Sequence, residues 1–171
     1  LSRGRGDVYK RQLLSSADPP GIVMSTDIMV PSIDQSMPAE LSYPIITGIL
    51  RNELHYDGVV LTDALYMQGL SERTGAYPGV DQYTAGVLAI KAGCDMLLDG
   101  YDITSSHIMI QTIENAVQSG QLTLARINQS VLRILTLKFE RGLLPFMPQS
   151  VPGAPQPQFL SLAQMPIDHR G

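Results

Sequence analysis

The chain has 171 residues, of which 44% are hydrophobic and 16% charged, and its formal net charge is −4 at pH 7. This length is enough for one domain with a sizeable core. The acidic balance argues against a surface that binds nucleic acid or anionic lipid, and no stretch approaches the roughly 20 apolar residues of a membrane span. Cys94 is the only cysteine, so the chain cannot form an intramolecular disulfide.

Residues 1–20 are the least regular part of the chain. The first twelve, LSRGRGDVYKRQ, are basic and follow neither a helical nor a strand periodicity. An RGRG run is compatible with a nucleic-acid-binding arm, but we expect a disordered or foreign leader that takes no part in the fold. The predicted domain therefore begins at Gly21, directly after Pro19 and Pro20.

The first predicted strand–helix unit covers residues 22–54. Residues 22–26 are a short apolar run that stops at Asp27, which predicts a strand. After a loop, Ser42 is a favourable N-cap, and Pro44 falls in the first turn of the predicted helix, where its missing N–H costs nothing. The apolar face of this helix consists of Ile46, Ile49, Leu50 and Leu54.

The central stretch is residues 57–65, with the sequence DGVVLTDAL. An apolar run rich in β-branched residues follows Gly58 and stops at Asp63, which is the pattern of a buried strand in a parallel sheet. Functional groups of barrels and doubly wound sheets gather at the carboxyl ends of the strands. From the residues alone, Asp63 is either a reactive carboxylate or a cap of the turn that follows.

A third unit follows with the same spacing. A helix is predicted over residues 81–91, and the apolar run 94–98 stops at Asp99. The three acids that end the predicted strands, Asp27, Asp63 and Asp99, are each 36 positions apart. A (β/α)8 barrel of roughly 250 residues allots about 31 residues to each unit, so this spacing indicates three βα units with a parallel sheet. Right-handed crossovers would place the three acids along one rim.

Two long helices close the predicted domain, residues 21–144. The first starts at 102 or 104 and ends at Gly120, and the second is capped by Thr123 and ends at Gly142. The proline-rich residues 145–171 are expected to be a tail or linker. The predicted inner faces are Ile110, Ile113 and Val117 in the first helix, and Leu124, Ile127, Val131, Ile134, Leu135 and Lys138 in the second.

The fold class expected is α/β. Three strands cannot close a barrel, because closure needs all strands with matched tilt and shear. The chain is therefore either a small open sheet or the last part of a barrel whose first part is absent. We expect the second, namely the last three βα units of an incomplete (β/α)8 TIM-type barrel, whose partner is the missing N-terminal part.

Four segments support a more specific interpretation. They are GIVMSTDIMVPSIDQSMPAELS (21–42), ITGILRNELHYDGVVLTDALYMQGL (46–70), AIKAGCDMLL (89–98) and RINQSVLRILTLKFERGL (126–143). Together they resemble the N-terminal catalytic barrel of glycoside hydrolase family 3, most closely its β-N-acetylhexosaminidase branch. The last segment is similar to the helix that closes that barrel.

The resemblance implies a role for Asp63. In that family the Asp of the [ST]-D segment is the nucleophile, and a retaining glycosidase needs a rigidly held carboxylate that attacks the anomeric carbon. The implied reaction is removal of terminal β-linked N-acetylglucosamine from a carbohydrate partner such as a muropeptide or a chitin fragment. The family needs no metal and no organic cofactor.

The acid/base partner is not found in this chain. In the hexosaminidase branch a His with a supporting Asp acts from a loop of the K-H-F-P-G-H-G-D-T type, which precedes the region seen here, and no such segment is present. His55 lies at the wrong end of the predicted strand, His107 lies early in a surface helix, and His169 lies in the tail. All three are interpreted as solvated side chains, so we expect the chain as given to be inactive.

Asp27, Met67 and Asp99 are the other rim residues considered. Asp27 stands in STDI, where the family commonly has A-H-I, so a sugar contact and a hydrogen-bonded rim residue both remain open. Met67, four residues beyond Asp63, matches a Met near the bound sugar in this branch, with ordinary packing as the alternative. Asp99 is expected to form a turn.

Three other classes of protein share part of this pattern. β-Glucosidases and β-xylosidases of the same family are the nearest, but the β-glucosidase branch usually has Trp directly after the nucleophile, where this chain has Ala64. A phospho-acceptor receiver module also places an Asp at the end of an apolar strand, but it needs a Lys after its last strand, where Asp99 and Gly100 stand. A nucleotide-binding half-domain is disfavoured because no G-x-G-x-x-G follows a strand.

Overall fold

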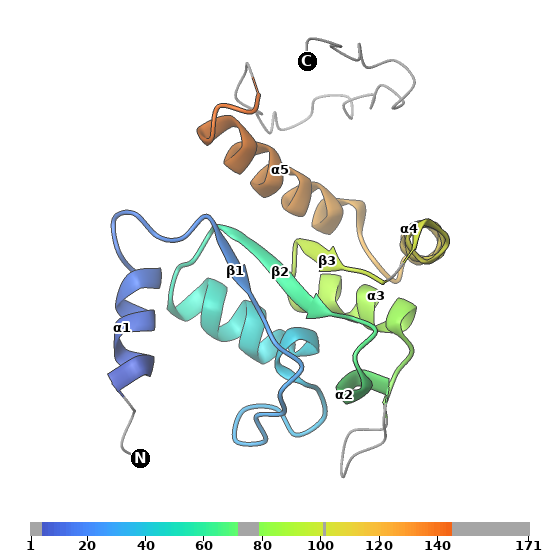
Figure 1. Cartoon of the computed structure of the whole chain (residues 1–171), viewed down its shortest axis with the longest axis horizontal. Helices are drawn as coiled ribbons and strands as arrows, with labels where there is room; N and C mark the ends of the chain where they lie inside the picture. The colour runs from blue at the N-terminus through green and yellow to red at the C-terminus, as the bar shows by residue number, and fades with distance from the viewer. Residues whose placement is uncertain (1–4, 72–78, 101, 145–171) are drawn as a thin grey trace.

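The computed structural model describes residues 5–71, 79–100 and 102–144. Its strands are β1 (Ile22–Met24), β2 (Val59–Ala64) and β3 (Met96–Leu98). They form one parallel sheet with β2 in the middle (Figure 1). Ile22 pairs with Val59 at one end of the sheet, and Ala64 pairs with Leu98 at the other. The structure therefore confirms the predicted parallel arrangement of the three strands.

Helical segments connect and flank these strands. In chain order they are α1 (Arg5–Leu14), the 3₁₀ turn η1 (Ala39–Leu41), the π-helix η2 (Pro44–Glu53), α2 (Gln68–Ser71), α3 (Gln82–Ala92), α4 (Ile103–Gln118) and α5 (Leu124–Glu140). Figure 1 shows α3 and α5 on opposite sides of the sheet, with α4 beside α3. Asp81, Asp102 and Thr123 cap α3, α4 and α5 through side-chain oxygens that accept backbone N–H groups.

The core lies on the side of the sheet that faces η2 and α3. Side chains of β2 alternate between the two faces, and Val60 and Thr62 are fully buried. Val60 belongs to a single cluster of buried side chains that includes residues of η1, η2, α3 and α4. The members of this cluster are Leu41, Ile46, Tyr56, Val60, Leu65, Leu70, Ala85, Ala89, Ala92, Cys94 and Met109.

The opposite face of the sheet is apolar but only partly covered. Its outer side chains Ile22, Met24, Met96 and Leu98 are 47%, 54%, 38% and 39% exposed. Near the amino ends of the strands, α5 lies over this face and borders an open pocket of about 420 Å³. The pocket is lined by Gly21, Ile22, Val59, Met96, Ile134, Leu137, Lys138, Arg141 and Leu143. Apolar side chains on both faces of a parallel sheet are typical of strands covered on both sides.

The expectation of an unstructured leader is wrong for part of it, because Arg5–Leu14 forms α1. Leu14, at the end of this helix, packs against the core cluster. Leu14 is the only residue of α1 with a described side chain that joins this cluster, and one such position gives no helical periodicity from which the helix could be predicted. Residues 145–171, expected to be a tail or linker, lie outside the described residues.

The helix predicted after Ser42 is present but is wound as a π-helix. Leu54 N–H donates to the carbonyl of Ile49 at 2.9 Å, a spacing of five residues. Tyr43 occupies the cap position, but Ser42 Oγ still accepts the N–H of Ile45 at 3.4 Å, and it donates to Asp34 at 2.7 Å. The three- and four-residue steps of apolar residues fit both helix types, so the sequence could not distinguish them.

Two predicted inner faces need correction. In α4, Ile110 is 54% exposed, whereas Met109 and Ala116 are buried. Met109 packs where Gly86 of α3 has no side chain, since its Sδ would lie 2.5 Å from a Cβ built there. In α5, Leu124 is 48% exposed. Lys138 is also exposed, so both residues lie outside the buried stripe predicted for them.

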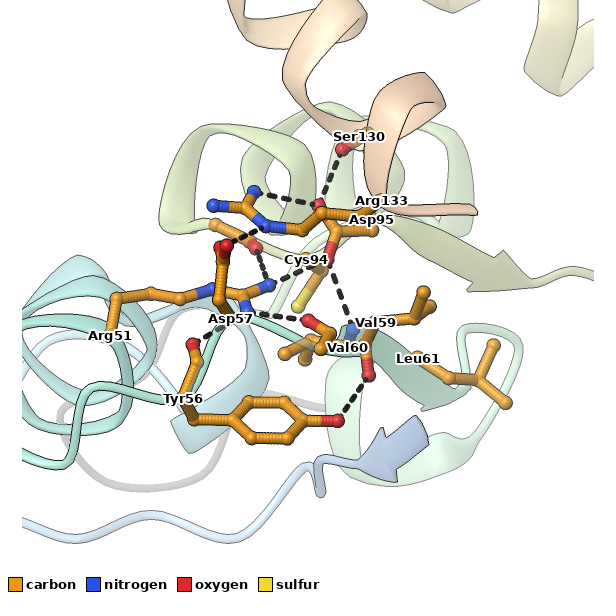
Figure 2. A network of polar contacts seen from close by, with 12 residues as sticks. Arg51, Tyr56, Asp57, Val59, Val60, Leu61, Cys94, Asp95, Ser130 and Arg133 are labelled. Atoms are coloured by element: carbon orange, nitrogen blue, oxygen red, sulfur yellow. Dashed lines mark hydrogen bonds and ion pairs between the residues drawn. The ribbon is translucent and has the colours of Figure 1, made fainter. Parts of the chain in front are cut away.

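A buried carboxylate ties η2 and α5 to the sheet. Asp95, directly before β3, has a fully buried side chain. Its Oδ2 accepts the N–H of Val60 at 3.0 Å and bonds to Arg51 Nη2 at 2.5 Å (Figure 2). Its Oδ1 accepts from Ser130 Oγ of α5 at 2.7 Å. Ser130 is buried because it makes this bond, which apolar periodicity could not indicate.

Two further arginines from α5 complete the charges around Asp95. Arg126 Nη2 and Arg133 Nη1 lie 3.4 and 3.3 Å from its Oδ1. Arg51 also donates to the carbonyl of Tyr56, so the network fixes the end of η2 as well. Because Asp95 precedes β3, this network lies at the amino ends of the strands, opposite the rim that carries Asp63.

Candidate functional site

Three carboxylates lie along the carboxyl edge of the sheet. Asp63 is the penultimate residue of β2, Asp27 follows β1, and Asp99 directly follows β3. The strands are parallel, and Ala64 pairs with Leu98, so the three acids share one edge of the sheet. This is the rim arrangement that their equal spacing predicts.

Asp63 is held through both its side chain and its backbone. It is half-buried, and its Oδ1 accepts the N–H of Ala64 at 2.8 Å. Its own backbone N–H donates to Oε2 of Glu40 at 2.7 Å. Leu65 N–H, two residues on, donates to the carbonyl of Leu98. Among the described residues, no hydrogen bond reaches Oδ2 of Asp63, so the carboxylate keeps one oxygen that can act outward from the rim.

Glu40 is a residue that sequence reasoning missed. It lies in the turn η1, is 0% exposed, and its carboxylate meets the backbone of β2 at the rim. Burial raises the pKa of Glu40 to about 7, and the charges of Asp27 and Asp63 add to the rise, while the bond from the Asp63 N–H opposes it. The turn is held in place because Glu40 N–H donates to the carbonyl of Thr26 at 3.0 Å.

Asp27 lies against the turn that follows β2. A Cβ built on Gly69 would collide with Oδ2 of Asp27, so the glycine allows the carboxylate to approach the backbone of α2. Met67 lies in the same turn, half-buried, and its N–H donates to the carbonyl of Ala64 at 3.0 Å. Both residues are therefore placed beside Asp63 at the carboxyl edge, where their suggested sugar contacts remain predictions.

Asp99 has local partners. Its Oδ1 accepts from Ser105 Oγ at 3.3 Å, and Ser105 in turn accepts from Gln82 Nε2 at 2.9 Å. Oδ2 of Asp99 is buried and has no hydrogen-bond partner among the described residues. These bonds join the end of β3 to the start of α4, which agrees with the turn-forming role predicted for Asp99.

The described histidines lie away from this edge or on the surface. His55 is exposed in the connection between η2 and β2, at the amino end of the strand, with a φ of 54°. His107 is exposed on α4. His169 lies outside the described residues. Within the described part of the chain, the rim therefore provides carboxylates and no imidazole.

The signal for Glu40 in the sequence is weak. It stands between Ala39 and Leu41 in a stretch that follows Pro38, and all four residues are buried. An acid flanked by two apolar residues in a loop has no recognisable periodicity. Only the tertiary contact between η1 and β2 reveals that its carboxylate meets the backbone of Asp63.

Metal and thiol chemistry find no support among the described residues. They contain no group of three or more His, Cys, Asp or Glu side chains that could hold a metal ion. Burial raises the pKa of the Cys94 thiol to about 12, so it stays protonated at neutral pH. None of the helices in the described residues is long and apolar enough to cross a membrane.

Comparison with known proteins gives a consistent family. The model described as "Glycosyl hydrolase family 3 N terminal domain" matches residues 6–137, a range that includes most of α1. The chain is 32% identical over 139 residues to β-hexosaminidase A of Pseudoalteromonas piscicida, covering 71% of this chain and 22% of that protein. It is 35% identical over 115 residues to a periplasmic β-glucosidase/β-xylosidase of Dickeya chrysanthemi, covering 58% of this chain and 16% of that protein.

A solved structure of the same family also matches this chain. The family 3 β-N-acetylglucosaminidase from Paenibacillus sp. str. FPU-7 superposes with a TM-score of 0.67 at 30% identity. The match covers 84% of this chain and 26% of that one. The chain thus spans about a quarter of this structure and less than a quarter of the two curated relatives above.

Proposed function

The chain belongs to glycosyl hydrolase family 3, and we propose that it carries the nucleophile half of a retaining glycosidase active site, with Asp63 as the nucleophile. The carboxylate would attack the anomeric carbon of the sugar and form a glycosyl-enzyme, which water then hydrolyses. The bond to the leaving group breaks as the bond from Asp63 to the sugar forms, and an acid supplies a proton to the departing oxygen.

The observation that carries this proposal is the way Asp63 is held. Its backbone N–H is bonded to a buried carboxylate, and Oδ1 is bonded to the next N–H. These contacts fix the orientation of the side chain at a strand end while Oδ2 remains available. A nucleophile needs this kind of fixed geometry because misplacement by about 1 Å can cost a hundredfold in rate.

The sheet supports the placement of this chain within a barrel. Its three parallel strands, its apolar and partly exposed second face, and the quarter of a relative's length that it covers fit the last three βα units of a (β/α)8 barrel. In that arrangement α5 is the closing helix. The remaining strands would cover the exposed face and bring the general acid/base.

The substrate that we propose is a terminal β-linked N-acetylglucosamine. The hexosaminidase and N-acetylglucosaminidase named among the relatives support this choice, and Ala64 stands where the β-glucosidase branch usually has Trp. Asp27 and Met67, which flank Asp63, would contact the sugar. The β-glucosidase/β-xylosidase relative makes a β-glucoside or β-xyloside the second candidate.

Replacement of Asp63 tests the function. In a full-length enzyme that carries this chain, Asp63→Asn and Asp63→Ala are expected to lower the turnover of an aryl β-N-acetylglucosaminide by at least about a thousandfold, since the covalent step is lost. Asp99→Asn, at the neighbouring strand end, is the matched control and should keep most of the activity. Turnover near that of the wild type in the Asp63 variants would contradict the assignment. An aryl β-glucoside assayed in parallel decides between the two substrates.

A further inference from the structure

Glu40 combines full burial with a direct hydrogen bond to the backbone of the proposed nucleophile. Its Oε2 lies 2.7 Å from the backbone nitrogen of Asp63, and its side chain is 0% exposed. The other oxygen, Oε1, is buried and has no hydrogen-bond partner among the described residues. A buried carboxylate with an unsatisfied oxygen is costly for a fold to keep.

A purely structural role accounts poorly for this arrangement. The N–H of Asp63 faces β1, and a neutral hydroxyl or amide in η1 could satisfy it without burying an ionisable group. The turn has other anchors as well, because Glu40 N–H donates to Thr26 and Cys94 Sγ lies 3.5 Å from the Glu40 carbonyl. Attachment of η1 to the sheet therefore does not require the carboxylate, and its presence indicates a different role.

We infer that Glu40 is a positioning residue for Asp63, whose carboxylate fixes the peptide that carries the nucleophile. This inference rests on the proposed function of Asp63. Hydrogen bonds to an ionised acceptor are about twice as strong as those between neutral groups. The ionised form of Glu40 therefore holds the Asp63 peptide more firmly than the protonated form does.

The surroundings place this change of charge near neutral pH. The charged groups that raise the pKa of Glu40 are Asp63 on β2 and Asp27 after β1, and the charge of Glu40 in turn helps to raise the pKa of the Cys94 thiol before β3. The titratable residues within α3, Tyr83 and Lys91, do not contribute to the shift. Because burial raises the pKa of Glu40 to about 7, its ionisation falls inside the range where a glycosidase can be assayed.

The test uses two substitutions that separate the acceptor from the charge. In a full-length enzyme that carries this chain, Glu40→Leu removes the acceptor, and Glu40→Gln keeps an acceptor oxygen but removes the charge. We expect Glu40→Leu to lower kcat by roughly tenfold to a hundredfold with KM nearly unchanged, because only the reacting geometry is affected. The kcat of the wild type should rise about fivefold through pH 7, and Glu40→Gln should lose this rise.

Controls keep a loss of folding apart from a loss of positioning. Asp34→Asn removes a carboxylate of the same loop, whose partners include Ser36 and Ser42 rather than Asp63, and it should keep the wild-type pH profile. Thermal melting of each variant gives the temperature at which it is fully folded for the assay. If Glu40→Leu does not fold, the pH profile of Glu40→Gln decides alone.

The outcomes distinguish this inference from the proposed function. A Glu40→Gln profile that retains the rise near pH 7, or a folded Glu40→Leu enzyme with wild-type kcat, overturns the role of Glu40. If Asp63→Asn is inactive in the same preparation, the nucleophile assignment survives that result. If Asp63→Asn is active, the proposed function fails and the inference about Glu40 fails with it.

Discussion

The ionisation of Glu40 should also affect the stability of the fold. Its pKa is about 7 in the folded protein and near 4.5 when unfolded. A folded pKa above the unfolded value means that the folded state binds the proton more tightly. The stabilisation is fully present below pH 4.5 and is lost as the pH rises through 7. On the order of 2 kcal/mol should be lost across this window.

Thermal melts of the full-length enzyme at pH 5 and pH 8 check this prediction. The wild type should melt lower at pH 8, by several degrees more than Glu40→Gln does. Asp34 provides a control of opposite sign, because hydrogen bonds led by that from Ser42 lower its pKa. The stabilisation from Asp34 is present above its ordinary pKa of 3.8 and is lost as the pH falls, so Asp34→Asn should lower the melting temperature by a similar amount at pH 5 and pH 8. An equal fall in wild type and Glu40→Gln between the two pH values would show that Glu40 is not the titrating group.

At the scale of single residues, the sequence indicates the position of Asp63 at a strand end but not the contact that Glu40 makes. Asp63 ends an apolar run rich in β-branched residues, and such a position predicts a strand-end carboxylate. Glu40 and Asp95 acquire their roles from contacts with residues 23 to 44 positions away in the chain. Because no local pattern encodes these contacts, both acids appear ordinary in the sequence.

Asp95 holds η2 and α5 against the sheet. It is the shared anion for Arg51 of η2 and for Arg126 and Arg133 of α5. Burial lowers the pKa of Arg51, while the charge of Asp95 opposes that shift. Removing the anion would leave buried guanidinium groups uncompensated, and such a change typically costs about 3–5 kcal/mol.

We therefore expect Asp95→Asn to lower the melting temperature of the full-length enzyme by on the order of 10 °C. Asp57→Asn is the matched control, because Asp57 pairs with Arg133 at 3.0 Å but its side chain is 88% exposed. That substitution should change the melting temperature little, as is usual for exposed ion pairs. A similar effect of the two substitutions would argue against Asp95 as the element that joins the helices to the sheet.

Helix ends were more predictable than helix faces. Asp81 and Thr123 cap α3 and α5, because a short acceptor side chain before an apolar run specifies a helix start. The exposure of Ile110 was not predictable, because Ile110 and Met109 are both hydrophobic and either could be assigned to the inner face of α4. Which residue faces inward depends on the space that Gly86 leaves on the neighbouring helix. That space is a property of the packed pair and not of either helix alone.

At the scale of the whole molecule, the uncovered face of the sheet has consequences for residues 21–144. Its exposed apolar side chains include Ile22 and Met24 on β1, at an edge of the sheet. We expect residues 21–144 expressed alone to be poorly soluble or loosely packed, because this face is only partly covered and the two edges of the described sheet are unpaired. Binding of a hydrophobic dye and a broad thermal transition are the expected observations. A sharp cooperative melt without dye binding would show that these residues are a complete folding unit.

The order of three strands and their helices followed from apolar runs, caps and the 36-residue spacing. Residues 6–137 match the family model, so the resemblance found from 21–144 extends to α1 as well. The described residues of the carboxyl edge include no imidazole, and under the proposed function the general acid/base would come from the remaining strands of the barrel.

Trapping the covalent intermediate tests the role of Asp63 most directly. A full-length enzyme that carries this chain is quenched during turnover of an activated β-N-acetylglucosaminide and then digested. The account predicts a peptide containing Asp63 that is heavier by one N-acetylglucosamine residue, with fragment ions that place the sugar on Asp63. The sugar on another carboxylate such as Asp27 or Glu40, or hydrolysis with inversion at the anomeric carbon, would contradict it.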